Sequence, residues 1–359
     1  MSGDRDFSRF EDVRRLFDDR TAYFEQFQTV RRSYDQKLES YRQKRADLEK
    51  SQREALEEIE RAFASEADVD RQELSKVAPI AEDEVAKTPT RRAAYSDRMA
   101  ALQAKLSLLA YIRFEDAEKR EVLDAALKQG GFSLRTWVAE QDNEAFVAEC
   151  DHFVCVAFRG TTSKTDQKTD FRVAVSKSTV DDHPGDVHVH SGFLAAFKSI
   201  EQPLRLALAN TDAAKPIYLT GHSLGGALAL IASAKFAGGD LLGERIAAVY
   251  TFGAPRVGDR HFRGAVKAPH YRIVNKYDFV PQAPPTWMSG YVHNGEPRIL
   301  DSKSAKPKRR ENGFSEVLLG LFSILLWPFT RRLLFMHVHN VSLYAARLDA
   351  IARVRGRWT

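Results

Sequence analysis

The chain has 359 residues, of which 43% are hydrophobic and 29% are charged, so it can bury one large core or two modest ones and is not a disordered chain. Lysine and arginine exceed aspartate and glutamate by only 54 to 49, and this formal net charge of +5 gives no indication of nucleic-acid binding. A mildly basic surface does favour contact with anionic membranes.

Neither the N-terminus nor the cysteines indicate passage through an oxidising compartment. The opening residues, MSGDRDFSRF, contain no apolar run of the kind found in secretory signal peptides. On one strand, Cys150 and Cys155 would lie about 16 Å apart at ~3.3 Å per residue, which is too far for a disulfide. The sequence therefore predicts a cytoplasmic protein, and export by a route that reads other signals stays open.

Residues 1–95 are predicted to form a helical arm. Apart from Gly3, the chain contains no glycine before Gly130, and steps of three and four residues from Phe10 to Ala62 meet apolar residues at twelve of sixteen positions. This spacing predicts a coiled coil or a helical hairpin whose first helix stops within the stretch 77–89. A second helical face, which includes Met99 and Leu109, can return along the first. We interpret the arm as a structural element that can self-associate rather than as a recognition module for one partner.

Residues 96–359 alternate short β-rich runs with helical patterns. Helical patterns cover residues 192–210 and 226–237, and the runs typical of strands are His152–Phe158, Pro216–Thr220, Ile246–Phe252 and His270–Asn275. This alternation predicts an α/β fold with a doubly wound, mostly parallel sheet and flanking helices. In such sheets the active residues gather at the carboxyl ends of the strands.

One turn in this region has the form G-x-S-x-G: Gly221-His222-Ser223-Leu224-Gly225. A buried strand enters it and a helix rich in Ala, Leu and Ile leaves it, which is the context of a nucleophile elbow. Gly221 and Gly225 supply the small residues that so sharp a turn needs, and the helix N-terminus faces any negative charge that develops beside Ser223. The sequence therefore favours Ser223 as a nucleophile over an ordinary serine in a glycine-rich turn.

A serine nucleophile needs a base, and the base needs an acid to orient it. His222 is predicted to be a packing residue, because its side chain points away from that of Ser223. In this type of hydrolase the acid and the histidine follow the serine along the chain, so the candidate bases are His261, His270, His293, His337 and His339.

Several motifs between about Met99 and Tyr344 resemble the class 3 lipase family, the fungal-lipase-like α/β-hydrolases. VAFRGTTS (156–163) is similar to the family's strand and oxyanion loop, HVHSGFLAAF (188–197) to its H-x-G-F segment, and LTGHSLGGALA to its elbow. TFGAPRVGD (251–259) resembles the strand after the elbow, and VNKYDFVPQAPP (274–285) resembles the acid loop. The resemblance implies an α/β-hydrolase domain that hydrolyses carboxylic esters without a metal or an organic cofactor.

Carried over residue by residue, the resemblance implies Ser223 as the nucleophile, Asp278 as the acid and His339 as the base. HNVSLYAARL (339–348) resembles the family's H-x-x-x-x-Y ending, which selects His339 over His337. The rival acids are Asp259, in the GAPRVG turn, and Asp301, in a polar run.

The implied oxyanion hole uses the backbone amides of Thr161 and Leu224. The neighbouring Arg159 is predicted to brace the loop that carries Thr161 by forming an ion pair. Gly160 is predicted to let this loop approach the substrate carbonyl.

An apolar segment, Val317–Thr330, is the candidate for contact with lipid. It is too short to span a bilayer, and it is flanked by KPKRR and RR. A peripheral membrane contact, a buried helix that leads to His339 and a lid over the site remain as interpretations. The loop after the oxyanion strand, residues 163–186, is polar and fits an apolar lid poorly.

The sequence predicts a serine hydrolase for acylglycerol or phospholipid esters that works through an acyl-enzyme, with no nucleic-acid partner. Two alternatives stay open. One is a soluble esterase for non-lipid esters, such as plant-wall phenolic esters. The other is a coiled-coil interaction protein whose hydrolase domain is catalytically silent.

Overall fold

The chain divides into two compact units, Met1–Val69 and Asp70–Thr359. The computed structural model describes residues 28, 31, 32, 35–40, 42, 43, 79–90, 94–112, 116–141, 143–160, 177–180, 186–238, 241–276, 278, 280–300 and 339–356. Every described residue of the first unit is α-helical, as the apolar spacing predicts. Most of the predicted seam lies outside the described residues, so coiled-coil pairing and self-association stay predictions.

A seven-stranded sheet forms the centre of the second unit. Its order is β1 (Ser133–Glu140), β2 (Asn143–Glu149), β3 (Val154–Phe158), β6 (Ile217–His222), β7 (Ile246–Phe252), β8 (His270–Asn275) and β9 (Glu296–Leu300). The pairs β1–β2 and β2–β3 are antiparallel, whereas β3, β6, β7, β8 and β9 run parallel to one another. The predicted mostly parallel α/β sheet is therefore confirmed. Two short strands, β4 (Lys177–Thr179) and β5 (His188–His190), pair separately.

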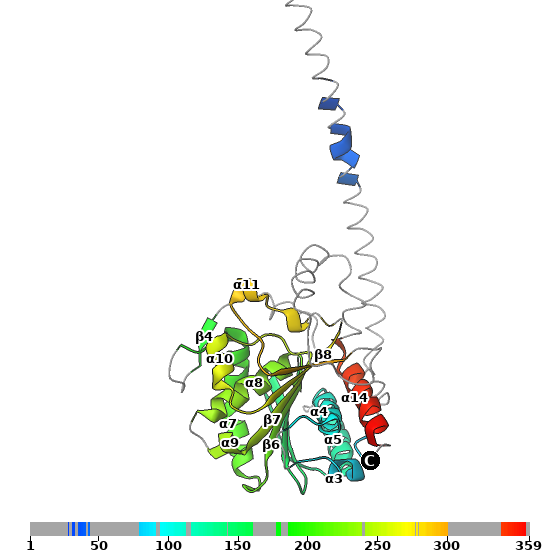
Figure 1. Ribbon diagram of the computed structural model, residues 1–359, viewed down its shortest axis with the longest axis vertical. Helices are drawn as coiled ribbons and strands as arrows, with labels where there is room; N and C mark the ends of the chain where they lie inside the picture. Colours follow the sequence, from blue (N-terminus) through cyan, green and yellow to red (C-terminus); the bar gives the residue numbers. More distant parts are fainter. Residues whose placement is uncertain are drawn as a thin grey trace, which may run out of the picture. The chain divides into compact units, whose positions relative to one another are not determined.

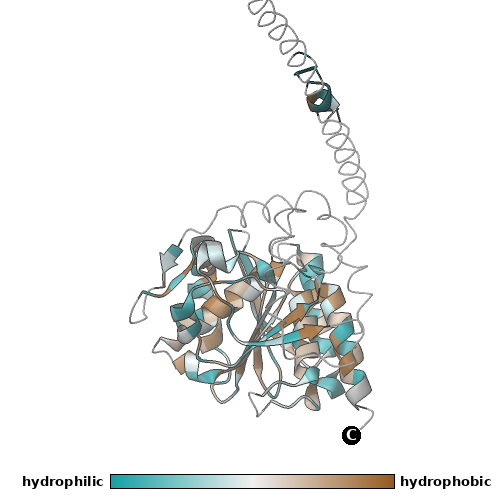
Figure 2. Ribbon diagram, turned by 45° about the horizontal axis from the view of Figure 1, so that its top comes forward, coloured by the Kyte–Doolittle hydropathy of each residue, from teal (hydrophilic) through white to brown (hydrophobic). Residues whose placement is uncertain are grey.

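Helices cover both faces of the sheet (Figure 1). One face carries α3 (Glu82–Ala86), α4 (Asp97–Leu109), α5 (Ala117–Gln129) and α14 (Val341–Gly356). The other face carries α7 (Ser191–Ala209), α8 (Leu224–Ala237), α9 (Leu241–Arg245) and α10 (Arg260–Ala265). Apolar residues, brown in Figure 2, occur on the strands and in both helix layers.

Each face of the sheet has its own hydrophobic core, because the side chains of a strand point alternately to the two faces. Val154 and Val156 of β3 pack with α7 and α8, whereas Cys155 and Ala157 pack with α4 and α14. Successive side chains of a strand point to opposite faces, so a strand that is apolar throughout supplies both cores. Cys150 and Cys155 are both buried and free, which agrees with the prediction that they form no disulfide.

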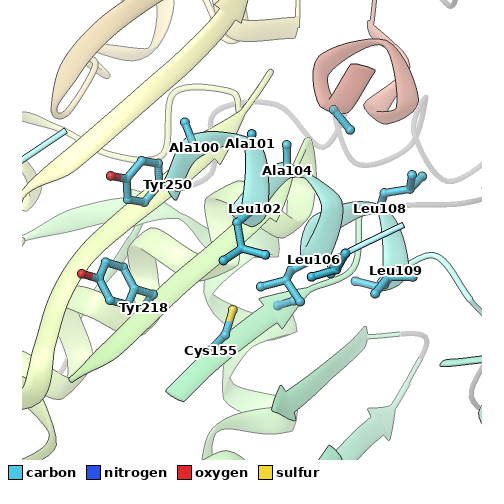
Figure 3. Close-up of a cluster of buried hydrophobic side chains, with 14 of the residues drawn as sticks. Ala100, Ala101, Leu102, Ala104, Leu106, Leu108, Leu109, Cys155, Tyr218 and Tyr250 are labelled. Atoms are coloured by element: carbon cyan, nitrogen blue, oxygen red, sulfur yellow. The ribbon is translucent and has the colours of Figure 1, made fainter. Parts of the chain in front are cut away.

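Helix α4 is buried along its length, with Arg98 as the exception. Figure 3 shows Leu102 and Leu106 pointing toward the strands that carry Tyr218 and Tyr250. The helix that the sequence predicts as a returning arm thus serves as a layer of the hydrolase unit, in contact with β6 and α14.

The division between the two units falls earlier than the boundary expected at residues 95 and 96. Ile80 and Val85, which precede that boundary, are buried in the same apolar cluster as α4.

Within the part of the chain that the structure describes, no helix combines the length and the apolar character needed to cross a membrane. The segment Val317–Thr330 lies outside the described residues, so its three interpretations are unchanged.

Candidate active site

Ser223 stands alone between β6, which ends at His222, and α8, which begins at Leu224. Its backbone has φ 57° and ψ −125°, a conformation that costs a residue with a side chain on the order of 1–3 kcal/mol. The surrounding structure holds this turn in place, because the Ser223 amide donates a hydrogen bond to the Phe252 carbonyl at 2.9 Å. Such strain is typical of a serine that is projected from a strand-to-helix elbow.

The two glycines of the motif are required by close backbone approach. A Cβ atom at Gly221 would collide with the carbonyl group of Gly225. A Cβ atom at Gly225 would collide with the carbonyl oxygen of Phe158, the last residue of β3. The interpretation that both positions must be small is therefore confirmed.

Asp278 and His339 form a buried pair at the carboxyl end of the sheet. Asp278 follows β8, its amide donates to the Asn275 carbonyl at 2.9 Å, and the residue is only 3% exposed. His339 stands two residues before α14. The Nδ1 atom of His339 lies 2.8 Å from Oδ2 of Asp278. Because a carboxylate only accepts hydrogen bonds, Nδ1 carries the proton and Nε2 is left unprotonated in the neutral ring.

Tyr344 is a second donor to the Asp278 carboxylate. Its hydroxyl lies 2.6 Å from Oδ2 of Asp278 and accepts a hydrogen bond from the Asn275 amide at 2.9 Å. Burial, and then the Asp278 carboxylate, raise the pKa of Tyr344 well above its ordinary value, so the hydroxyl remains a donor. The tyrosine of the H-x-x-x-x-Y pattern is the sequence signal for this contact, although the pattern alone does not reveal the tyrosine's partner.

Gly253, directly after β7, makes room for the acid–histidine pair. Its φ is +59°, and a Cβ atom there would lie 2.7 Å from Oδ2 of Asp278 and 3.0 Å from Nδ1 of His339. Glycine adopts this left-handed conformation without steric cost. Sequence reasoning did not single out this residue.

The pair lies beside the serine elbow. The ring centroids of His339 and His222 are 4.5 Å apart, and His222 directly precedes Ser223. The structure thus brings together residues from the end of β6, the loop after β8 and the approach to α14.

The rival residues that the structure describes have other contacts. Asp259 caps α10 by accepting from the Phe262 amide at 2.9 Å, and it lies 3.2 Å from Nδ1 of His188. The buried His270 contacts Thr251 Oγ1 at 2.8 Å through Nε2. Burial, followed by the charges of Arg272 and Arg256, holds the pKa of His293 well below its usual range.

Three of the residues weighed from sequence cannot be placed: Thr161, Asp301 and His337 lie outside the described residues.

The Leu224 amide is at the first position of α8, where the helix N-terminus favours negative charge. Arg159 forms a buried ion pair with Glu144, and its amide donates to the Glu144 carbonyl at 2.9 Å. The predicted ion pair of Arg159 is therefore present, and the bracing of the loop that carries Thr161 stays a prediction. Among the described residues, no group of three His, Cys, Asp or Glu side chains is placed to hold a metal ion.

Comparisons with known proteins agree with this geometry. Residues 155–288 match the family model described as lipase (class 3). A lipase of Rhizomucor miehei is 33% identical over 174 residues, which are 45% of this chain and 47% of that lipase. Residues 155–288 therefore form a class 3 lipase region of the chain.

A second curated relative and a solved structure extend the comparison. Toxin TseL of Vibrio cholerae serotype O1 is 40% identical over 116 residues, 31% of this chain and 17% of the toxin. The chain therefore spans less than half the length of either curated relative. The solved structure of Rhizomucor miehei triacylglyceride lipase matches with a TM-score of 0.54 and 23% identity, covering 70% of this chain and 98% of that one. This likeness shows a shared α/β-hydrolase fold.

Proposed function

We propose that this chain is a serine carboxylic-ester hydrolase of the class 3 lipase family that acts on lipid esters through an acyl-enzyme. The observation that carries the proposal is the strained Ser223 elbow beside the buried Asp278–His339 pair. The lipases among the relatives support a lipid ester as the substrate.

In the first half of the reaction, Ser223 Oγ attacks the ester carbonyl while Nε2 of His339 takes its proton. Asp278 keeps the other ring nitrogen protonated and stabilises the imidazolium that forms. The Leu224 amide, at the start of α8, and the Thr161 amide donate to the tetrahedral oxyanion. His339 then protonates the leaving alcohol, and the acyl group remains on Ser223.

In the second half, water attacks the acyl-enzyme. His339 takes a proton from this water, and the tetrahedral intermediate collapses to release the fatty acid and restore Ser223. As this intermediate collapses, His339 returns the proton to Ser223 Oγ, which is the nucleophile of the first half and the leaving group of the second, while Asp278 orients His339 in both halves.

The test compares wild type with Ser223→Ala on a nitrophenyl butyrate, an emulsified acylglycerol and labelled phospholipid vesicles. Wild type is expected to hydrolyse the nitrophenyl ester and at least one lipid, and Ser223→Ala to be slower by at least about 10³-fold. Ser233→Ala is a matched control, because Ser233 is a buried serine on α8 itself. Equal rates in wild type and Ser223→Ala would overturn the enzyme proposal, and activity on the nitrophenyl ester alone would overturn its lipid part.

A further inference from the structure

A line of hydrogen bonds outside the proposed triad joins three separate segments. Tyr111 lies just beyond the C-terminus of α4, and its hydroxyl is 2.7 Å from Nδ1 of His222. Nε2 of the same His222 ring is 2.5 Å from the carbonyl oxygen of His339. At the other end, the Tyr111 hydroxyl lies against the Gly160 backbone, where an added Cβ atom would collide with the hydroxyl oxygen. Gly160 directly precedes Thr161 in the loop proposed to hold the oxyanion.

The carbonyl of His339 sets the direction of both hydrogen bonds of the His222 ring. The His339 carbonyl can only accept, so Nε2 of His222 carries a proton and donates it. In the neutral ring Nδ1 is then an acceptor, and the Tyr111 hydroxyl donates to it. The Tyr111 hydroxyl, both ring nitrogens of His222 and the His339 carbonyl are satisfied in this single arrangement.

Protonation of His222 would break the arrangement, because Nδ1 would become a second donor facing the Tyr111 hydroxyl. His222 is only 4% exposed. Burial, and then the neighbouring His339, hold the pKa of His222 well below its usual range, so the ring stays neutral at physiological pH.

The Tyr111 hydroxyl and the His222 carbonyl leave no space for a side chain at position 160. A Cβ atom at Gly160 would collide with the Tyr111 hydroxyl and would lie 2.7 Å from the carbonyl oxygen of His222. In this structure the missing side chain of Gly160 therefore lets the loop approach Tyr111 and the elbow.

We propose that Tyr111 and His222 are positioning residues that hold His339 and Gly160 in register with Ser223. The inference rests on the proposed function of the same site. His222 is bonded covalently to Ser223 and holds the main chain of His339 through its ring. A single rigid side chain thus ties the nucleophile to the base. Tyr111 hydrogen-bonds to His222 and lies against Gly160, so the positions of Gly160, Ser223 and His339 all depend on the His222 ring.

Two substitutions of His222 separate positioning from packing. In His222→Gln the side-chain NH₂ lies near the position of Nε2 and still donates to the His339 carbonyl. In His222→Asn the amide oxygen lies near Nδ1 and still accepts from Tyr111, but the link to His339 is lost. We expect His222→Gln to keep kcat within about threefold of wild type and His222→Asn to lose about 10- to 100-fold, with KM little changed, since small displacements of a catalytic group carry penalties of this size.

Tyr111→Phe removes only the hydroxyl and loses the same bond as His222→Gln, so it is expected to lower kcat by about two- to threefold at unchanged KM. Tyr218→Phe is its matched control, because the Tyr218 hydroxyl donates to the Thr90 carbonyl at 3.1 Å, outside this line. The control is expected to keep the wild-type kcat. Equal kcat values for His222→Gln and His222→Asn, or losses of kcat that simply follow the melting temperature, would overturn the positioning role.

A spectroscopic measurement tests the line without relying on ester hydrolysis. In ¹⁵N-histidine-labelled full-length protein, the His222 ring is expected to be the neutral Nε2–H tautomer at neutral pH, and Tyr111→Phe is expected to shift its Nδ1 signal. If wild type hydrolyses no ester but this tautomer is found, the proposed function fails and the hydrogen-bonded line stands. A protonated His222 or an Nδ1–H tautomer would overturn the line itself.

Discussion

The Tyr344 hydroxyl gives the sharpest stability prediction for the candidate site. Tyr344→Phe removes two buried hydrogen bonds, one to the Asp278 carboxylate at 2.6 Å and one from the Asn275 amide at 2.9 Å. Tyr344 is fully buried, so water is not expected to replace the missing oxygen without rearrangement. A hydrogen bond to a charged group contributes about 1.5–3 kcal/mol, and a buried amide left without an acceptor costs about 1–3 kcal/mol. Allowing for partial relaxation, we expect the free energy of unfolding to fall by about 2–4 kcal/mol.

Urea unfolding followed by circular dichroism measures this loss, and Tyr218→Phe supplies the comparison. The Tyr218 hydroxyl makes one neutral hydrogen bond, so its removal is expected to cost about 1 kcal/mol. Tyr344→Phe is also expected to lower kcat, because one of the donors that orient the Asp278 carboxylate is gone. A stability loss no larger than that of Tyr218→Phe, together with an unchanged kcat, would refute this role of the Tyr344 hydroxyl.

Three further predictions concern the elbow, a buried histidine and the arm. Gly225→Ala places a Cβ atom against the Phe158 carbonyl and is expected to destabilise the fold by more than about 3 kcal/mol; a melting temperature close to that of wild type would contradict this. Burial lowers the pKa of His270 from 6.5 to about 3. Between these pH values the imidazole binds a proton in the unfolded chain but not in the folded one, so the free energy of unfolding falls as the pH drops from 6.5 toward 3. Urea unfolding should therefore show that wild type loses about 2–3 kcal/mol more than His270→Gln between pH 7.5 and 4.5, and equal losses would count against the buried neutral ring. Deleting residues 1–69, the first unit, is expected to reduce any oligomer to a smaller species in light scattering, and an unchanged oligomeric state would discard self-association through the arm.

Predictions from the sequence succeeded where the physical constraint is local. The bounds of β7 and β8 coincide with the predicted apolar runs, and β6 continues two residues beyond its prediction into the elbow. Gly221 is crowded by Gly225 within the same turn, so the sequence reveals this constraint, whereas the Phe158 carbonyl that crowds Gly225 comes from β3 and is known only from the tertiary structure. The pattern of α4 likewise indicates a helix, but a helical pattern does not specify which surface the helix covers. Only the tertiary structure places α4 on the sheet.

The sequence by itself thus determined the α/β class, the strands and the turn that carries Ser223, because these depend on neighbours in the chain. The tertiary structure decided the contacts between residues far apart: Tyr111 meets His222 across 111 positions, and His339 meets Asp278 across 61. It also assigned a use to Gly253, whose lack of a side chain matters only once the Asp278–His339 pair lies against it. No periodicity records such contacts, because they arise when separate strand ends meet at one edge of the sheet.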